Sequence, residues 1–126
     1  MVIVYESLTG NIKRFVGKLN NLLLNDKFIK LNRSMEINEP YVLITCTTGF
    51  GHIPKSVQIF LEKNHENLQA VVGSGDRNWG TRFCQASKDI SLIYHVPLLH
   101  TFEKSGLQTD VEIVAHKINE LKRKGE

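Results

Sequence analysis

The sequence predicts an α/β protein with a doubly wound sheet of five parallel strands, in the spatial order 2-1-3-4-5. Short apolar runs rich in β-branched residues alternate along the chain with segments of helical periodicity, which is the pattern of a parallel sheet covered by helices on both faces. A length of 126 residues, 41% of them hydrophobic, suits one domain over residues 1–126. The order of elements, with right-handed crossovers, is compatible with such a sheet.

The strands are expected at 2–5, 27–31, 41–45, 68–72 and 96–100. The second is the weakest, because it is short and a polar stretch, 32–40, follows it. Four apolar stripes at helical spacing predict the helices: Ile12, Phe15, Val16, Leu19, Leu22 and Leu23; Val57, Phe60 and Leu61; Phe83, Ala86, Ile90 and Ile93; and Val111, Val114, Ala115, Ile118 and Leu121. The last helix is expected to open with a capping box at Thr109-Asp110-Val111-Glu112.

Composition excludes several classes of function. No apolar run is long enough to span a membrane and no leader precedes the first strand, so we expect a soluble, cytoplasmic protein. The net charge is +3 and the positively charged residues are scattered along the chain, so charge does not point to a nucleic-acid partner. Cys46 and Cys84 are expected to be buried thiols rather than a disulfide or metal site, and among the dispersed histidines only His52 lies near a candidate site.

The loop after the first strand combines Ser7, Thr9, Gly10 and Asn11 at the start of an amphipathic helix. Hydroxyls, a glycine and the free N–H groups of a helix N-terminus are what a phosphate monoester needs. The alternative is that these side chains only cap the helix.

Two further glycine-rich loops follow the third and fourth strands. Residues 47–54 place two glycines around an aromatic residue, and residues 73–80 contain the only tryptophan, Trp79, among polar residues and glycines. Either loop alone is compatible with an ordinary turn. Because ligands bind in such sheets beyond the carboxyl ends of the strands, where the strand order reverses, the three loops together outline one pocket. A phosphate cradle, hydroxyls and two aromatic faces suit flavin mononucleotide (FMN).

The chain also resembles a known family. The motif Ser7-x-Thr9-Gly10-Asn11 resembles the phosphate loop of flavodoxins, and nearly the whole chain is similar to the NrdI family, the flavodoxin-like accessory proteins of class Ib ribonucleotide reductase. The stretches that carry this resemblance are 7–15, 47–54, 73–80, 96–97, 102–106 and 109–111. Ile12 stands where many flavodoxins have a threonine, and the surface is less acidic than in electron-shuttling flavodoxins, which argues against a generic shuttle.

The resemblance implies a set of FMN-binding residues and no catalytic or metal-ligating side chain. The set is Ser7, Thr9, Gly10, Asn11, Ile12, Thr47, Thr48, Gly49, Phe50, Gly51, Ser74, Gly75, Asp76, Asn78, Trp79 and Gly80. Trp79 is expected to stack on the flavin, while Asp76 has the alternative role of a turn residue and Arg77 faces solvent or a partner.

The resemblance also implies a function. Reduced FMN would react with dioxygen and supply superoxide to the dimanganese radical subunit of the reductase, after reduction by an unidentified electron donor. Two alternatives remain open at this point: a generic electron shuttle, and a flavodoxin-like binding module without flavin. A phosphatase is excluded because no Cys-x5-Arg follows the first strand, and a receiver domain because the strand ends carry Ser7, Thr47 and Ser74 in place of clustered aspartates.

Overall fold

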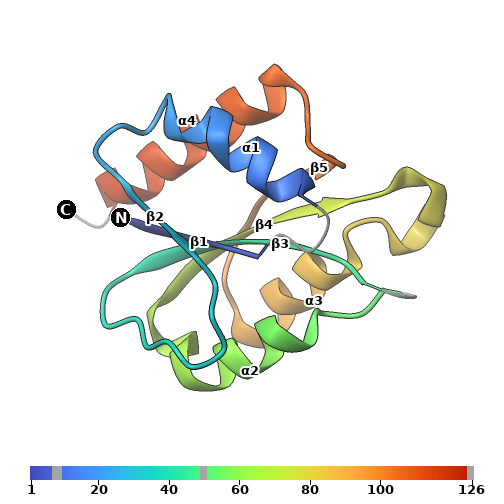
Figure 1. The fold of residues 1–126 in the computed structure, drawn as a ribbon, viewed down its shortest axis with the longest axis horizontal. Coiled ribbons are helices and arrows are strands. Elements are labelled where there is room, and N and C mark those ends of the chain that lie inside the picture. Colours follow the sequence, from blue (N-terminus) through green and yellow to red (C-terminus); the bar gives the residue numbers. More distant parts are fainter. Residues whose placement is uncertain (7–9, 49–50, 125–126) are drawn as a thin grey trace.

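The computed structural model contains a five-stranded parallel sheet in the order β2-β1-β3-β4-β5 (Figure 1). The structure describes residues 1–6, 10–48 and 51–124. The strands are β1 (Val2–Tyr5), β2 (Lys27–Lys30), β3 (Tyr41–Cys46), β4 (Leu68–Gly75) and β5 (Leu98–Glu103). The predicted fold class and strand order are therefore confirmed. The order reverses between β1 and β3, which is where a ligand site is expected.

Helices cover both faces of the sheet. The helices α1 (Asn11–Asn20) and α4 (Gln108–Lys124) lie on one face, and α2 (Lys55–Asn64) and α3 (Gln85–Tyr94) on the other (Figure 1). Two short 3-10 helices, η1 (His65–Asn67) and η2 (Arg77–Arg82), flank β4. Alternate residues of a strand point to opposite faces, so Val42 packs under α1 and α4 while Leu43 packs under α2 and α3.

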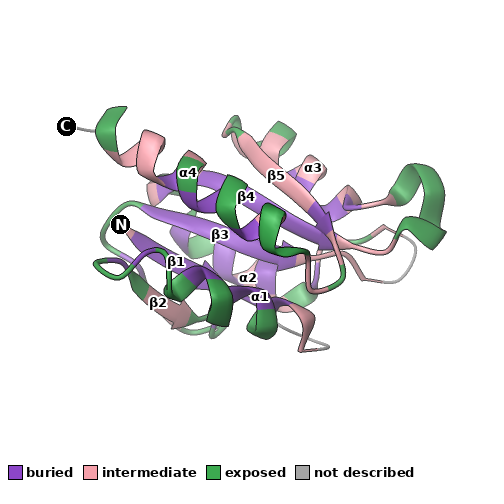
Figure 2. Ribbon diagram, turned by 90° about the horizontal axis from the view of Figure 1, so that it is seen from above, coloured by how far each residue is buried: buried purple, intermediate pink, exposed green. Residues whose placement is uncertain are grey.

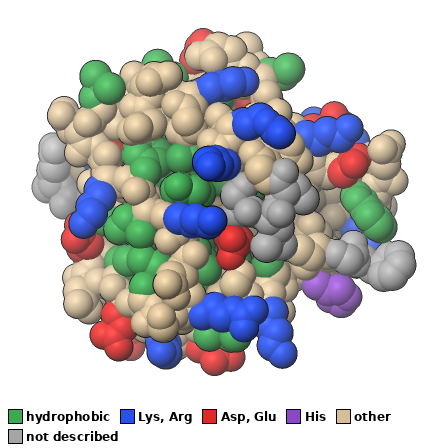
Figure 3. All heavy atoms as spheres, viewed as in Figure 1, with side chains coloured by type: hydrophobic (Ala, Val, Ile, Leu, Met, Phe, Trp, Pro, Cys, Tyr) green, Lys and Arg blue, Asp and Glu red, His purple; other side chains and the backbone are tan. Residues whose placement is uncertain are grey.

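The sheet centre is buried and the outer helix faces are exposed (Figure 2). On the face seen in Figure 3, Lys and Arg side chains are scattered among acidic and uncharged groups. Within the described part of the chain, no helix combines the length and apolar character needed to cross a membrane.

The structure corrects three local predictions. The fifth strand begins at Leu98, two residues later than expected, and continues to Glu103. Leu22 and Ile93 belong to the predicted apolar stripes but are 44% and 58% exposed; Leu22 lies beyond the end of α1, and Ile93 lies one residue before the end of α3. Phe83 precedes α3 instead of belonging to it.

The capping box predicted at Thr109 is also wrong. The helix α4 begins at Gln108, so Thr109 already lies in its first turn. The carboxylate of Asp110 instead accepts a hydrogen bond from the backbone N–H of Leu107, the residue just before the helix, at 2.7 Å. The acid thus caps the helix from its third position, which is half of a capping box shifted by two residues.

Candidate functional site

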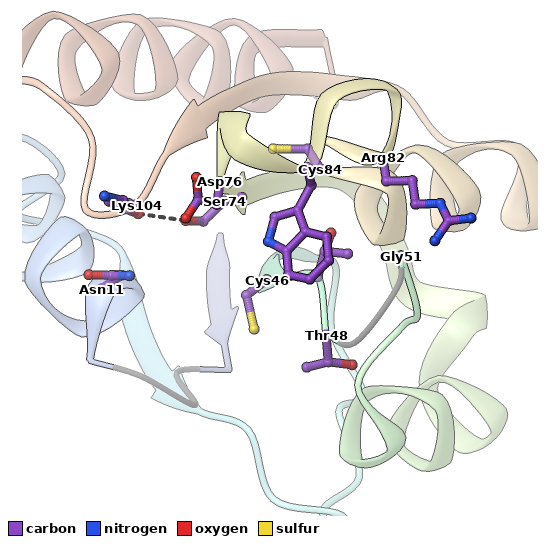
Figure 4. A pocket seen from close by; sticks show the side chains of 12 residues that line it. Asn11, Cys46, Thr48, Gly51, Ser74, Asp76, Arg82, Cys84 and Lys104 are labelled. Atoms are coloured by element: carbon purple, nitrogen blue, oxygen red, sulfur yellow. Dashed lines mark hydrogen bonds between the residues drawn. The ribbon is translucent and has the colours of Figure 1, made fainter.

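A cavity of about 360 Å³ opens at the carboxyl edge of the sheet (Figure 4). Its size lies within the range of small-molecule sites, roughly 300–1,000 Å³. It is lined by Asn11, Cys46, Thr47, Thr48, Gly51, Ser74, Gly75, Asp76, Trp79, Arg82, Cys84 and Lys104. These residues come from the start of α1, the end of β3, the end of β4 with η2, and the turn after β5, so all three predicted loop regions contribute.

The start of α1 forms one end of the cavity. Gly10 has φ +86°, a conformation that favours glycine, and Asn11 follows it as the first helical residue. The N–H groups of a first helical turn have no acceptor within the helix, and Gly10 has no side chain to cap them. This end of the cavity is therefore suited to an anion, as the helix dipole also favours.

The segment after β3 is held by hydrogen bonds of its own. The Thr47 hydroxyl accepts the backbone N–H of Ala86 in α3 at 3.0 Å. Thr48 and His52 form an antiparallel bridge, with N···O distances of 2.9 and 2.7 Å. Thr48 and Gly51 are thereby fixed at the cavity wall, while the exposed His52 is not among the residues that line it.

The segment after β4 brings Trp79 to the cavity. Asp76 precedes η2, and its carboxylate accepts the backbone N–H of Asn78 at 2.9 Å. Trp79 lines the cavity and is 48% exposed, so part of this large aromatic side chain is accessible to a ligand. Gly80 has φ +58° and ψ −121°, which allows the chain to turn back toward α3. Asp76 thus makes the turn contact that was its alternative role, and it also lines the cavity.

The floor beside β4 is tightly packed against the start of α3. A Cβ on Gly75 would lie 2.8 Å from the backbone N and 2.9 Å from the Sγ of Cys84. Cys84 is 1% exposed, and burial raises the pKa of its thiol to about 11 despite the nearby Lys88. Cys84 therefore stays protonated at neutral pH and acts as a small apolar wall residue. The expectation of a buried thiol is confirmed for Cys84, whereas Cys46 is only partly buried.

The structure brings together half of the predicted cofactor residues. Asn11, Thr47, Thr48, Gly51, Ser74, Gly75, Asp76 and Trp79 line the cavity. Gly10, Ile12, Asn78 and Gly80 are placed but do not line it, and Ile12 is a core residue at 1% exposure. Ser7, Thr9, Gly49 and Phe50 lie outside the described residues.

Four lining residues were not predicted: Cys46, Arg82, Cys84 and Lys104. Cys46 ends β3 one residue before the predicted loop, a position that the strand pattern could have indicated. Arg82 and Cys84 lie just beyond the glycine-rich stretch, and Lys104 lies in the stretch 102–106, outside the three loops predicted to form the pocket.

The chemistry of the cavity fits a flavin phosphate. It offers a helix N-terminus at one end, the half-exposed Trp79, hydroxyls and backbone amides, and two cationic side chains, Arg82 and Lys104. Within the described residues no group of three or more His, Cys, Asp or Glu side chains could hold a metal ion.

Comparison with known proteins decides the family. Residues 3–116 match the model of the family described as "NrdI Flavodoxin like". The chain belongs to the NrdI family. A protein from Macrococcus caseolyticus (strain JCSC5402) named "Protein NrdI" is 46% identical over 121 residues, which cover 96% of this chain and 91% of the relative.

Solved structures show that the NrdI-family chain has the flavodoxin fold. A short-chain flavodoxin associated with a non-canonical PDU bacterial microcompartment superimposes with a TM-score of 0.74 at 17% identity, covering 99% of this chain and 97% of that one. Oxidised flavodoxin 2 from Bacillus cereus gives a TM-score of 0.73 at 21% identity, covering 98% and 97%. Membership in this flavodoxin-like family implies flavin binding in general.

Proposed function

We propose that the chain binds FMN and serves as the redox accessory protein of a class Ib ribonucleotide reductase. The observation that carries this proposal is the cavity at the carboxyl edge of β1, β3 and β4, with a helix N-terminus at one end and Trp79 on its wall, in a chain of the NrdI family. When bound and reduced, FMN would supply the one-electron reduction of dioxygen to superoxide, which the dimanganese radical subunit consumes.

The start of α1 is the proposed phosphate site. The N–H of Ile12 and the side chain of Asn11 belong to the first helical turn, and Gly10 leaves the approach to that turn open. Ser7 and Thr9 are proposed to add hydroxyl donors. Because Ile12 is buried in the core, its contribution is limited to the backbone N–H.

The isoalloxazine ring is proposed to lie between the segment after β3 and the segment after β4. Trp79 is proposed to supply a face for stacking, since it lines the cavity and is 48% exposed. The cavity wall there is formed by Thr48, Gly51 and Gly75, whose backbone polar groups the flavin ring could approach closely. Asp76 shapes the turn that carries Trp79.

The same segments are proposed to face the partner. Superoxide must leave beside the flavin ring, so Gly49, Phe50 and Trp79 are expected to lie near the radical subunit. Arg77 belongs to this rim; its side chain is 68% exposed and its Nε lies 3.9 Å from Glu103. We propose that the protein acts in the cytoplasm, where an unidentified donor reduces it.

The test is the visible spectrum of the purified protein during anaerobic reduction and re-exposure to air, with and without the manganese-loaded radical subunit. We expect a flavin spectrum, and a tyrosyl radical detected by electron paramagnetic resonance only when both proteins are present. A flavin spectrum without a tyrosyl radical would contradict the accessory role and favour a generic electron shuttle. A colourless protein that takes up no added FMN would contradict flavin binding and favour a flavin-free binding module.

A pair of variants tests the pocket itself. Trp79→Ala removes the proposed stacking face, and we expect FMN affinity to fall by about tenfold, the loss of roughly 1–1.5 kcal/mol. Leu92→Ala removes a side chain that is 73% exposed and does not line the cavity, so it should leave affinity unchanged. Equal FMN affinity in both variants would contradict stacking on Trp79.

A further inference from the structure

We propose that Lys104 is a specificity-determining residue: its ammonium group faces the flavin phosphate and makes the chain prefer FMN to riboflavin. This inference rests on the proposed function, because it assigns a further residue to the same pocket. Lys104 lies in the turn after β5, outside the three glycine-rich loops, and it lines the cavity.

The backbone of Lys104 is fixed at the rim of the cavity by β4. Its N–H donates to the Gly75 carbonyl at 2.8 Å, and its own carbonyl accepts the hydroxyl of the buried Ser74 at 2.5 Å. Its φ of +53° lies in the left-handed region, which a lysine seldom adopts. The two hydrogen bonds hold this unusual conformation, which sets the direction in which the side chain leaves the turn.

The turn lies beside α1. A Cβ on Gly106 would be 3.0 Å from the ring of Phe15, and that ring stacks on Phe102 with centroids 4.0 Å apart. Asn11 lies one helical turn before Phe15 and lines the same cavity. Lys104 and Asn11 occur at the same end of the cavity, away from Thr48 and Arg82 (Figure 4). A lysine side chain can therefore reach the proposed phosphate position.

Nearby carboxylates are engaged elsewhere. Glu103 accepts the backbone N–H of Arg77 at 3.1 Å, and Asp76 accepts that of Asn78. Within residues 1–6, 10–48 and 51–124, no carboxylate forms an ion pair with Lys104. Its positive charge thus remains available to an anion at this end of the cavity.

A second cation lies near the start of α1 but has a different position. The guanidinium of Arg14 donates to the Asn11 side-chain oxygen at 3.0 Å, and Arg14 does not line the cavity. Arg82 lines the cavity from η2, at the end where Thr48 lies (Figure 4). Among these three cations, Lys104 alone combines a place on the wall with proximity to α1.

The test compares two ligands that differ only by the phosphate. FMN and riboflavin are titrated into the apoprotein, with quenching of flavin fluorescence as the readout, for the unsubstituted chain, Lys104→Gln and Lys104→Arg. We expect Lys104→Gln to weaken FMN binding by about two- to fivefold, as for a solvent-exposed ion pair, and to leave riboflavin binding unchanged. Lys104→Arg should restore most of the preference.

Two controls separate this role from others. Lys18→Gln removes the same charge from the last turn of α1, away from the cavity, and should not change the ratio of the two affinities. Raising the salt concentration from about 0.02 M to about 0.5 M should reduce the difference between the unsubstituted chain and Lys104→Gln. Thermal melting by circular dichroism checks that each variant is folded.

Three other outcomes would contradict either the role of Lys104 or the proposed function. If Lys104→Gln weakens FMN and riboflavin equally, the residue acts through the turn or the ring, and the assignment to the phosphate is wrong. If it changes neither affinity, the assignment is also wrong. If the unsubstituted chain binds neither flavin, the proposed function itself fails, and that result is distinguishable because no variant is needed to see it.

Discussion

At the scale of single residues, the glycines of β4 matter as much for packing as for the cavity. The sequence predicted that the glycine-rich stretch 73–80 helps to outline a ligand pocket. The structure shows that two of its glycines also leave room for α3 and the residue before it: a Cβ on Gly73 would lie 2.0 Å from the Oγ of Ser87, and a Cβ on Gly75 would lie 2.8 Å from the backbone N of Cys84. Sequence alone could not separate these two needs, because both select a residue without a side chain.

This packing gives a prediction with a matched control. Gly73→Ala forces a methyl group against the buried Ser87, so we expect the free energy of unfolding to fall by about 1–3 kcal/mol. Gly17→Ala places a methyl group where no atom lies within 4 Å, inside α1, and should raise it by about 0.5–1 kcal/mol. Urea unfolding followed by circular dichroism measures both. A stabilised Gly73→Ala protein would show that α3 can shift without cost.

At the scale of elements, Asp110 joins β5 to α4. Its Oδ1 lies 2.8 Å from Nε2 of His100 in β5, and its Oδ2 caps α4 at Leu107. Burial raises the pKa of Asp110, but the N–H of Leu107 and the neighbouring His100 together outweigh it and lower the pKa below its usual range. A lowered folded-state pKa adds stability above the unfolded-state value of about 3.9, and that stability is lost as the pH falls below it.

The corresponding prediction concerns pH. Asp110→Ala should lower the free energy of unfolding by about 1 kcal/mol near pH 6, which is the usual value of a helix cap, and by progressively less below about pH 4. Glu112→Ala, an exposed position in the same helix, is the control and should change stability by less than about 0.5 kcal/mol. A difference that stays constant from pH 6 to pH 3 would contradict a role for the ionised carboxylate.

Periodicity predicted which elements exist but not where each one ends. The stripe from Ile12 to Leu19 is buried as expected, whereas Leu22, beyond the end of α1 at Asn20, is exposed. Ends are set by local contacts, such as the Asp110 carboxylate on Leu107, which depend on how the chain is packed. Which residues beyond the predicted loops reach the cavity also depends on how the chain is packed, so Arg82 and Lys104 were not predicted as cavity residues.

At the scale of the whole molecule, the alternation of strands and helices was enough to predict the sheet, because parallel strands need long crossovers with a fixed hand. A salt bridge between two residues far apart in the sequence was not predictable. Nζ of Lys122 in α4 lies 2.8 Å from Oδ2 of Asp26, a residue 96 positions earlier whose side chain is 2% exposed. No pattern along the sequence marks such a pair.

The contribution of this salt bridge to stability can be tested by removing one partner. Lys122→Met leaves a buried carboxylate without its lysine, and we expect the free energy of unfolding to fall by about 1–3 kcal/mol. Lys124→Met, an exposed lysine of the same helix, should have little effect. Asp26 also pairs with the N-terminal ammonium of Met1, 3.2 Å from its Oδ1, so equal stability of the two variants would mean that this ammonium group or water compensates for the lost lysine.

The position of Trp79 gives the molecule a built-in optical reporter. It is the only tryptophan in the chain, and it lies on the cavity wall and not in either hydrophobic core. Its emission therefore reports on the polarity and occupancy of the cavity, while the far-ultraviolet signal reports on the sheet and helices. A conformational change limited to the segment after β4 would alter the first signal and leave the second unchanged, without any attached label.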